Sequence, residues 1–301
     1  EWSRIEPEEG KFDEKELEHY RDVISALRER GIGPFVSLWH WTLPVWLQEK
    51  GGVLASNFPD YFARYTGRVL DALQHTIRFW ITVNEPEIYA LNSYVRGKWP
   101  PQKRRLFSFF SVTHALSMAH RRAYQVIKKS LPDAQVGVAV NQSYFESVGG
   151  VVNDILTWGA ERLWNRWFLR HVSNELDFIG LNYYFHNRID YGLNKNRNEK
   201  VSDMGHELYP EGLYRVLLGL KKFQKPIYIT ENGLADAQDK HRTWFIQEHI
   251  RWMKKAMDES VDVRGYFYWS LLDNFEWDKG FWPRFGLVEV DYNTMERKVR
   301  Q

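Results

Sequence analysis

The stretch Phe79-Trp80-Ile81-Thr82-Val83-Asn84-Glu85-Pro86 contains the pattern that decides the fold. It begins with a short run that is apolar almost throughout, as expected of a strand that is buried on both faces in a parallel sheet. The run ends in Asn84 and Glu85, so an amide and a carboxyl group directly follow the strand. The same arrangement recurs along the chain.

Apolar runs of this kind alternate with stretches of helical character. The expected strands are Pro34–Trp39, Phe79–Val83, Val136–Val140, Phe178–Leu181, Ile227–Thr230 and Gly265–Trp269. One expected helix is capped by Asp13, runs to Arg30 and stops at Gly31. The others cover about Phe58–Leu73, Leu106–Ser130, Asp154–His171, Gly212–Phe223 and Arg242–Ser260. Strands that alternate with helices indicate an α/β fold.

Polar or aromatic side chains stand at the end of every expected strand. They are His40-Trp41, Asn84-Glu85-Pro86, Asn141, Asn182-Tyr183-Tyr184, Glu231-Asn232-Gly233 and Trp269-Ser270. A TIM barrel builds its active site in this way, from the C-terminal ends of all its strands. An open doubly wound sheet uses one crevice instead, and no Gly-rich phosphate-binding fingerprint follows any strand. We therefore predict a TIM (β/α)8 barrel, with residues 1–301 as a single, partial TIM-barrel domain.

The predicted barrel is short of strands. A TIM barrel has eight strands, the pattern shows six, and Glu1–Ile5 is a candidate for the tail of another. We therefore expect a partial barrel from which the first one to two βα units are missing. A homo-oligomer or a complementing N-terminal segment would be the partner that closes it.

The composition is that of a globular protein, with 301 residues, 44% apolar and 27% charged. A net charge of +2 indicates neither nucleic acid nor an anionic membrane as partner. The sequence has no apolar run long enough to span a membrane. Because the chain has no Cys, it has no disulfide and no thiolate zinc site, and we expect a cytoplasmic protein. The 14 Trp suit a concave site that stacks sugar rings, although helical ones such as Trp158 are expected to be core or helix-packing residues.

Two strand-end carboxylates point to the chemistry. Glu85 and Glu231 follow different strands, and each lies beside an Asn. A single Glu at such a position often caps a helix or pairs with an Arg. Two of them with matched neighbours favour glycoside hydrolysis, which needs one carboxyl group on each side of the scissile bond.

Five motifs resemble glycoside hydrolase family 1, the β-glucosidase family. Trp80–Pro86 resembles its acid/base signature, and Tyr228–Gly233 resembles its nucleophile signature. Trp269–Trp277 resembles its sugar-binding segment, and Leu38–Pro44 and Gly180–Tyr184 also match. The resemblance extends from Trp2 to Val299.

The resemblance implies a retaining mechanism through a covalent glycosyl-enzyme. Glu231 would be the nucleophile, and Glu85 would be the general acid and then the base. Their carboxyl groups would lie about 5–5.5 Å apart. Glu85 would need a raised pKa to stay protonated, whereas Glu231 would stay ionised. Tyr184 would donate a hydrogen bond to Glu231 and orient it.

The same motifs imply the substrate-binding residues. Asn84 would bind the 2-hydroxyl, His40 and Trp277 the 3-hydroxyl, and Glu276 the 4- and 6-hydroxyls. Trp269 would stack under the ring. The further candidates are Trp41, Asn141 and Asn182. The chemistry requires no metal and no organic cofactor. Because Glu276 would repel a 6-phosphate, we expect small neutral β-glucosides, β-galactosides or β-fucosides.

Two other functions remain open at this point. One is a catalytically weak or inactive carbohydrate-binding fragment of the same fold. It gains weight because family members carry upstream a substrate-binding Gln and an Arg that contacts the nucleophile, and neither is found here. The other is a related barrel hydrolase with an open cleft for polysaccharide. The two catalytic Glu count against the first, and Asn274–Trp277 counts against the second.

Overall fold

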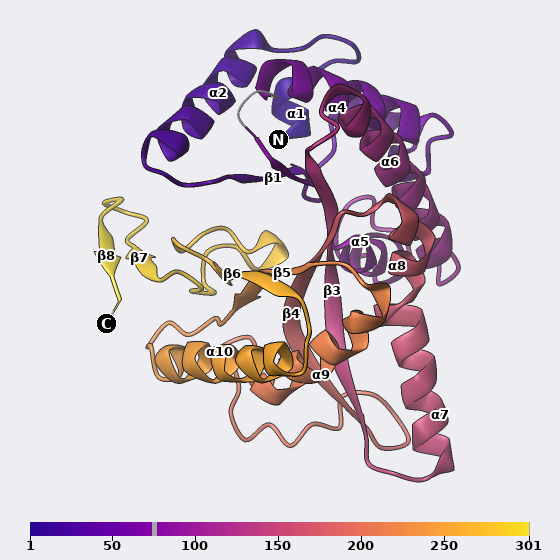
Figure 1. The fold of residues 1–301 in the computed structure, drawn as a ribbon, viewed down its shortest axis with the longest axis vertical. Helices are drawn as coiled ribbons and strands as arrows, with labels where there is room; N and C mark the ends of the chain where they lie inside the picture. The colour runs from indigo at the N-terminus through magenta and orange to yellow at the C-terminus, as the bar shows by residue number, and fades with distance from the viewer. Residues whose placement is uncertain (74–76, 301) are drawn as a thin grey trace. The chain divides into compact units, whose positions relative to one another are not determined.

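The computed structural model describes residues 1–73 and 77–300, which fold into two compact units (Figure 1). The first unit comprises Glu1–Val140 and Phe168–Gly180. The second comprises Asn141–Trp167 and Leu181–Gln301. Strands alternate with helices through both, which confirms the predicted α/β class.

The sheet of the first unit is formed by four neighbouring strands. They are β1 (Phe35–Trp39), β2 (Phe79–Asn84), the first part of β3 (Gln135–Ser147) and the start of β4 (Phe178–Ile189). The pairs β1·β2 and β2·β3 are parallel, and Phe35 lies opposite Phe79. The rings of these two residues stack at 4.2 Å, and Phe178 meets both edge-on. This aromatic layer sets the register of the strands at one end of the sheet.

The three long helices of the first unit, α2 (Glu14–Glu29), α4 (Phe58–Leu73) and α6 (Ser108–Ser130), follow the expected ranges closely. Its shorter helical segments were not expected, except that α8 (Trp167–Val172) overlaps the helix expected at Asp154–His171. The others are α1 (Trp2–Ile5), α3 (Val45–Glu49), η1 (Gly52–Leu54), α5 (Pro86–Tyr89), η3 (Ala90–Val95) and η5 (Ser173–Glu175). As predicted, α2 is capped by Asp13, whose Oδ1 accepts from the backbone N–H groups of Lys15 and Glu16. Such a cap stabilises a helix by about 1 kcal/mol.

The prediction of a strand tail at Glu1–Ile5 is wrong, because these residues form α1. Trp2 decides the local conformation. Its side chain is only 1% exposed and stacks on Tyr65 at 4.9 Å, and its Nε1 donates to Glu6 at 2.8 Å. A helical turn brings the indole and the Glu6 carboxylate together, and Arg64 pairs with the same carboxylate.

His120, on α6, is a buried neutral histidine that contacts η5 and β2. His120 is fully buried, and this burial lowers its pKa to about 4. Its Nε2 donates to the Glu175 carbonyl at 2.7 Å, so Nδ1 accepts from the Thr82 hydroxyl at 2.7 Å. His120 therefore has a structural role.

The second unit contains the rest of β3 and β4, followed by β5 (Ile227–Gly233) and β6 (Val263–Trp269). The pair β5·β6 is parallel. The helices are α7 (Val151–Ala160), η4 (Glu161–Asn165), α9 (Pro210–Leu220), η6 (Lys221–Phe223), α10 (Arg242–Asp258) and η7 (Trp277–Lys279). α9 packs on α10. An antiparallel hairpin of β7 (Val288–Val290) and β8 (Arg297–Val299) was not expected, since each strand has only three residues.

The helix predicted at Asp154–His171 is interrupted in the structure. α7 ends at Ala160, and the wider π-helical turn η4 leads to Asn165. The Asn165 side chain accepts from the Ser143 N–H at 3.0 Å and donates to the Ser143 carbonyl at 2.8 Å. This attachment to β3 accounts for the local widening. Trp158 is 61% exposed, so of its two expected roles, core or helix-packing, the first is wrong.

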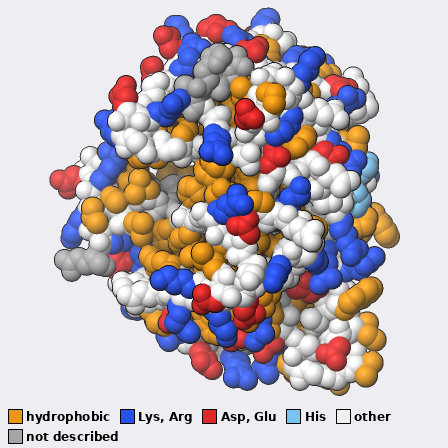
Figure 2. All heavy atoms as spheres, in the orientation of Figure 1, with side chains coloured by type: hydrophobic (Ala, Val, Ile, Leu, Met, Phe, Trp, Pro, Cys, Tyr) orange, Lys and Arg blue, Asp and Glu red, His pale blue; other side chains and the backbone are white. Residues whose placement is uncertain are grey.

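The described surface mixes both signs of charge. On the face drawn in Figure 2, Lys and Arg side chains lie among Asp and Glu side chains, in keeping with the net charge of +2. Within residues 1–73 and 77–300, no helix has the length and apolar character needed to cross a membrane.

Candidate active site

Glu85 lies in the first unit at the turn from β2 into α5. Its backbone N–H donates to the Ala139 carbonyl of β3 at 2.8 Å, and its side chain is 4% exposed. The backbone is left-handed there, with φ 43° and ψ 59°. For a residue with a side chain this conformation costs about 1–2 kcal/mol, and such strain is concentrated at functional sites. The strand end therefore holds one buried carboxyl group in a specific, strained position.

Asn84 is held between His40 and Trp41. The Asn84 Nδ2 donates to His40 Nε2 at 3.1 Å, and Trp41 Nε1 donates to the Asn84 carbonyl at 3.0 Å. Burial lowers the pKa of His40 to about 4, so the ring is neutral near pH 7. Because Nε2 accepts, the ring proton is on Nδ1. The predicted residues His40, Trp41 and Asn84 thus form one connected group beside Glu85.

Sequence reasoning missed an aromatic neighbour of this group. Trp99 packs on Trp41 with ring centroids 4.6 Å apart, and His40 meets Trp41 edge-on at 4.8 Å. Trp99 lies in an irregular segment between η3 and α6, where no periodic pattern points to a function. The signal that could have indicated it is a Trp among the polar and Pro residues of a loop.

Glu231 lies in the second unit near the end of β5. The Tyr184 hydroxyl, on neighbouring β4, donates to Glu231 Oε2 at 2.9 Å. Tyr183 makes a different contact, since its hydroxyl donates to the Tyr209 carbonyl and its ring is 2% exposed. The two tyrosines therefore contact different groups, as alternation along a strand requires.

Hydrogen bonds to neighbouring strands fix both residues that flank Glu231. The Thr230 hydroxyl donates to Asn182 Oδ1 at 2.6 Å. The Asn232 amide donates to the Tyr183 carbonyl at 2.7 Å and accepts from the Tyr266 hydroxyl at 2.9 Å. Thr230 and Tyr266 were not among the predicted residues. Together these bonds position the Glu231 backbone and restrict where its carboxylate can lie.

Trp269 is the last residue of β6, and Glu276 and Trp277 belong to the segment that follows it. A cis peptide bond joins Trp269 to Ser270, and Trp277 has a left-handed backbone with φ 47°. The Glu276 N–H donates to the Gly280 carbonyl at 2.7 Å. Asp273 supports the segment, because its buried carboxylate accepts from the Gly286 N–H at 2.8 Å.

The structure thus divides the predicted residues between the two units. His40, Trp41, Asn84 and Glu85 are connected in the first unit. In the second unit, hydrogen bonds join Tyr184 to Glu231 and place Asn182 against the neighbouring Thr230. Asn141 is 1% exposed on β3, Trp269 is the last residue of β6, and Glu276 and Trp277 follow that strand. Each unit presents one carboxylic acid at a strand end among aromatic and amide groups.

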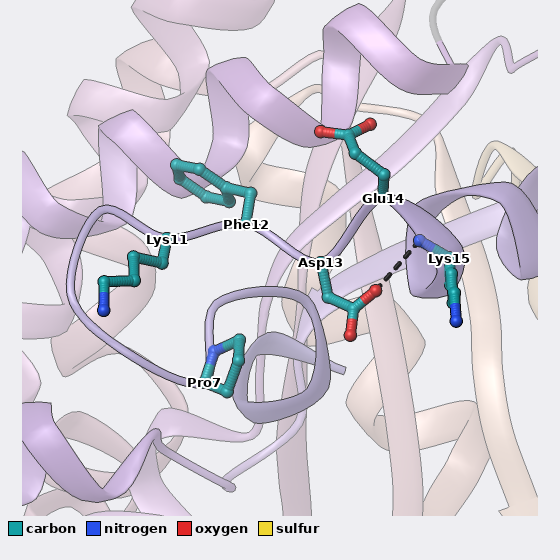
Figure 3. Close-up of a pocket in the computed structure, with 6 residues that line it drawn as sticks. All are labelled: Pro7, Lys11, Phe12, Asp13, Glu14 and Lys15. Atoms are coloured by element: carbon teal, nitrogen blue, oxygen red, sulfur yellow. Dashed lines mark hydrogen bonds between the residues drawn. The ribbon is translucent and has the colours of Figure 1, made fainter.

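A separate hollow of about 460 Å³ is lined by Pro7 and by the run from Lys11 to Lys15. Figure 3 shows that it adjoins the Asp13 cap of α2. None of the candidate site residues lines it. The hollow is a feature of the capping turn.

The comparisons with known proteins agree on one family. The family model of Glycosyl hydrolase family 1 matches residues 1–174 and 169–301. A 1,4-beta-D-glucan glucohydrolase of Thermotoga neapolitana is 32% identical over 348 residues, which cover 99% of this chain and 78% of the relative. A beta-galactosidase of Sulfolobus acidocaldarius is 33% identical over 326 residues, which cover 92% of this chain and 66% of the relative.

Solved structures extend the likeness to the fold. The structure of a beta-glucosidase from Thermotoga maritima in complex with noeuromycin matches with a TM-score of 0.93 and 33% identity. The match covers 100% of this chain and 78% of that chain. These neighbours are TIM barrels, which confirms the predicted fold class.

Proposed function

The chain belongs to glycosyl hydrolase family 1, and on that premise we propose that it hydrolyses terminal non-reducing β-D-glycosyl residues with retention of configuration. The observation that carries the proposal is the hydrogen bond from Tyr184 to Glu231 at a strand end. A carboxylate that accepts from a fixed phenol is oriented for attack. We also propose that residues 1–301 act as one glycosidase domain, with Glu85 and Glu231 as its two catalytic carboxyl groups.

Glu231 is the nucleophile in this proposal. One of its oxygens forms a bond to the anomeric carbon while the bond from that carbon to the leaving oxygen breaks. Tyr184 donates to Oε2, which directs the other oxygen, Oε1, at the sugar. The bonds made by Thr230 and Asn232 hold the backbone on either side during the step.

Glu85 is the general acid and then the general base. It gives its proton to the leaving oxygen in the first step, and it takes a proton from the attacking water in the second. Both steps need the carboxyl groups on opposite sides of the anomeric centre, about 5–5.5 Å apart. The strained backbone at Glu85 and its bond to Ala139 hold the acid at one angle, which suits a group that must reach a single oxygen atom.

The sugar-binding roles follow the connected groups. Asn84 binds the 2-hydroxyl, where a hydrogen bond strengthens in the transition state. His40 is neutral and its Nε2 accepts from Asn84, so its Nδ1–H can donate to a hydroxyl group, and it binds the 3-hydroxyl with Trp277. Glu276 binds the 4- and 6-hydroxyls, and Trp269 stacks under the ring. Trp41, Asn141 and Asn182 border the sugar.

The substrate class is a small neutral β-glycoside. Relatives named as a glucan glucohydrolase, a beta-glucosidase and a beta-galactosidase support this class. A carboxylate at Glu276 disfavours a sugar that carries a 6-phosphate, because like charges repel at short range. We propose β-glucosides, β-galactosides and β-fucosides as the substrates.

Hydrolysis of p-nitrophenyl β-D-glucoside tests the proposal. Release of p-nitrophenol by the wild type, with the β-anomer of glucose appearing first in proton NMR spectra, is the expected result. The α-anomer appearing first would contradict retention. Sugar binding by calorimetry without any release would favour the carbohydrate-binding alternative, and loss of both would contradict the proposed site.

A further inference from the structure

The helix α7 turns its polar side inward. Asn153 is 3% exposed, donates to the Gly149 carbonyl at 2.9 Å and accepts from the Tyr191 N–H at 2.8 Å. Twelve residues later, at the end of η4, Asn165 is 5% exposed and bonded to both backbone groups of Ser143. Amide side chains therefore anchor the inner face, where a helix on a soluble protein ordinarily places apolar side chains.

The outer face of the same segment is apolar. Six large hydrophobic side chains on it are between 43% and 75% exposed: Val151, Val152, Ile155, Leu156, Trp158 and Leu163. Tyr191 (79% exposed) and Leu193 (57% exposed) extend the surface, since the Tyr191 backbone is bonded to Asn153 of α7. We call these eight side chains the α7 patch. Figure 2 shows hydrophobic side chains along the lower right edge, where Figure 1 draws α7.

The α7 patch is about as large as the largest apolar patch of a typical monomer. A fully exposed aliphatic side chain has an apolar surface on the order of 60–120 Å². Eight side chains that are about half exposed therefore present roughly 400–500 Å² of apolar surface. The largest apolar patch on a typical monomer is about 300–600 Å² and is commonly functional. Two such surfaces face to face bury roughly 800–1,000 Å² of apolar surface, which is near the lower limit of about 1,000 Å² for a specific protein interface.

The charges around the patch suit a second copy of this chain better than a lipid surface. Helix α7 contains the exposed acid Asp154 and no basic residue, and Asp190 adds an exposed acid beside Tyr191. Acidic groups at the contact disfavour an anionic membrane, which attracts Lys- and Arg-rich helices. Arg162, exposed and positioned over the Trp158 ring at 5.4 Å, follows Asp154 by eight residues.

We propose that the α7 patch is the interface of a homodimer in which two copies of α7 pack antiparallel about a two-fold axis near Trp158. Trp158 lies midway between Asp154 and Arg162 along the sequence. A two-fold axis there brings Asp154 of each copy beside Arg162 of the other, so one surface is complementary to itself. This interface buries the apolar side chains on the outer face of α7, which are exposed because the helix turns its polar side inward. It does not depend on the proposed hydrolysis.

Cysteine cross-linking tests this geometry, because the natural chain has no Cys. A Trp158→Cys variant should form an interchain disulfide when copper phenanthroline and oxygen accept the electrons, and a reductant should reverse it. The matched control is Met257→Cys, on α10 of the same unit and 43% exposed, which should stay monomeric on a non-reducing gel. Equal cross-linking of the two variants, or none in either, would overturn the two-fold arrangement.

Sedimentation equilibrium of the unoxidised protein tests the interface itself. The wild type should be a dimer, Ile155→Glu should raise the dissociation constant about tenfold or more, and Met257→Glu should not change it. Arg162→Glu should weaken the dimer, and adding Asp154→Lys to that variant should restore it in part. A wild type that is still monomeric at about 100 µM overturns the proposal, because an interface that forms in solution should be populated at that concentration. Flotation of that monomer with phosphatidylserine vesicles, lost in Ile155→Glu, would assign the patch to lipid instead.

Discussion

The Tyr184 hydroxyl donates a hydrogen bond of 2.9 Å to Oε2 of Glu231, from one strand to the next. Both residues belong to motifs that resemble one enzyme family, yet their contact depends on the register of β4 against β5. Tyr183 is turned the other way and donates to the Tyr209 carbonyl. The pair of tyrosines therefore provides a matched comparison of a site hydroxyl with a structural one.

Replacing Tyr184 with Phe should lower kcat about 10- to 100-fold with little change in KM. A hydrogen bond to a charged acceptor contributes about 1.5–3 kcal/mol, and about 1.4 kcal/mol corresponds to a factor of ten in rate. Steady-state kinetics with an aryl β-glucoside measure the change. The control Tyr183→Phe should lower the melting temperature instead and leave kcat of the folded enzyme unchanged. The reverse pattern would remove Tyr184 from the proposed site.

The nucleophile assignment predicts a specific product. Glu231→Ala should lower hydrolysis about 10⁴-fold or more, as expected when the group that forms the covalent bond is lost. Azide fits the vacated space and attacks from the same face, so an aryl β-glucoside should yield the α-glycosyl azide, identified by proton NMR. Formation of the β-azide would show that the roles of Glu231 and Glu85 are exchanged.

The acid assignment predicts a dependence on the leaving group. Glu85→Ala should retain more activity on 2,4-dinitrophenyl glucoside than on cellobiose, because a good leaving group needs no proton. Azide should then give the β-azide.

The left-handed backbone at Glu85 predicts a difference in stability between two variants. Glu85→Gly should be about 1 kcal/mol more stable than Glu85→Ala in urea unfolding, since Gly adopts that conformation without strain. Equal stabilities would show that the backbone relaxes.

Much of the fold was predictable where the signal is local. Asp13 caps α2 as predicted, and α4 has the predicted bounds, because capping and helical periodicity act over a few residues. The ends of two strands were predicted wrongly, because β3 and β4 continue to Ser147 and Ile189, past Asn141 and Asn182. Glu1–Ile5 was predicted wrongly, since the burial of Trp2 against Tyr65 is decided by a segment far along the chain.

The contacts that support the candidate site were less predictable. The bond from Thr230 to Asn182 and the packing of Trp99 on Trp41 join residues that are far apart in the sequence. Both depend on strand register or loop path, which one sequence does not specify. The exposed face of α7 was missed because apolar residues at helical spacing ordinarily indicate a core-facing stripe.

Buried neutral histidines predict how stability depends on pH. Burial lowers the pKa of His40, His120 and His249 to about 4, against 6.5 for an exposed histidine. Between pH 4 and 6.5 the unfolded chain binds protons that the folded chain does not, so stability is fully present above pH 6.5 and falls as pH decreases. Each histidine should contribute a slope of about 1.4 kcal/mol per pH unit.

The variant His120→Gln isolates one of these contributions. Urea unfolding at pH 5.0, 5.5 and 6.0 should show a free energy of unfolding that changes with pH by about 1.4 kcal/mol per unit less than in the wild type. The variant loses bonds to Thr82 and Glu175, so it should be less stable at pH 7. Only the slope reports on titration. An unchanged slope would mean that His120 is protonated in the folded protein.

The close approach of Gly233 to Trp269 predicts that a larger residue at position 233 will destabilise the second unit or displace Trp269. A Cβ built there would lie 1.9 Å from the Trp269 carbonyl oxygen, and backbone atoms on adjacent strands cannot move aside cheaply. Gly233→Ala should therefore either displace Trp269 or lower the free energy of unfolding by about 1–3 kcal/mol, as overpacking does. Gly219→Ala is the matched control, because no described atom lies within 4 Å of its added Cβ and it is in α9. Alanine there should be neutral or stabilise by about 0.5–1 kcal/mol. If Gly233→Ala keeps both wild-type stability and wild-type KM for β-glucosides, the close approach of β5 to β6 is not what positions Trp269.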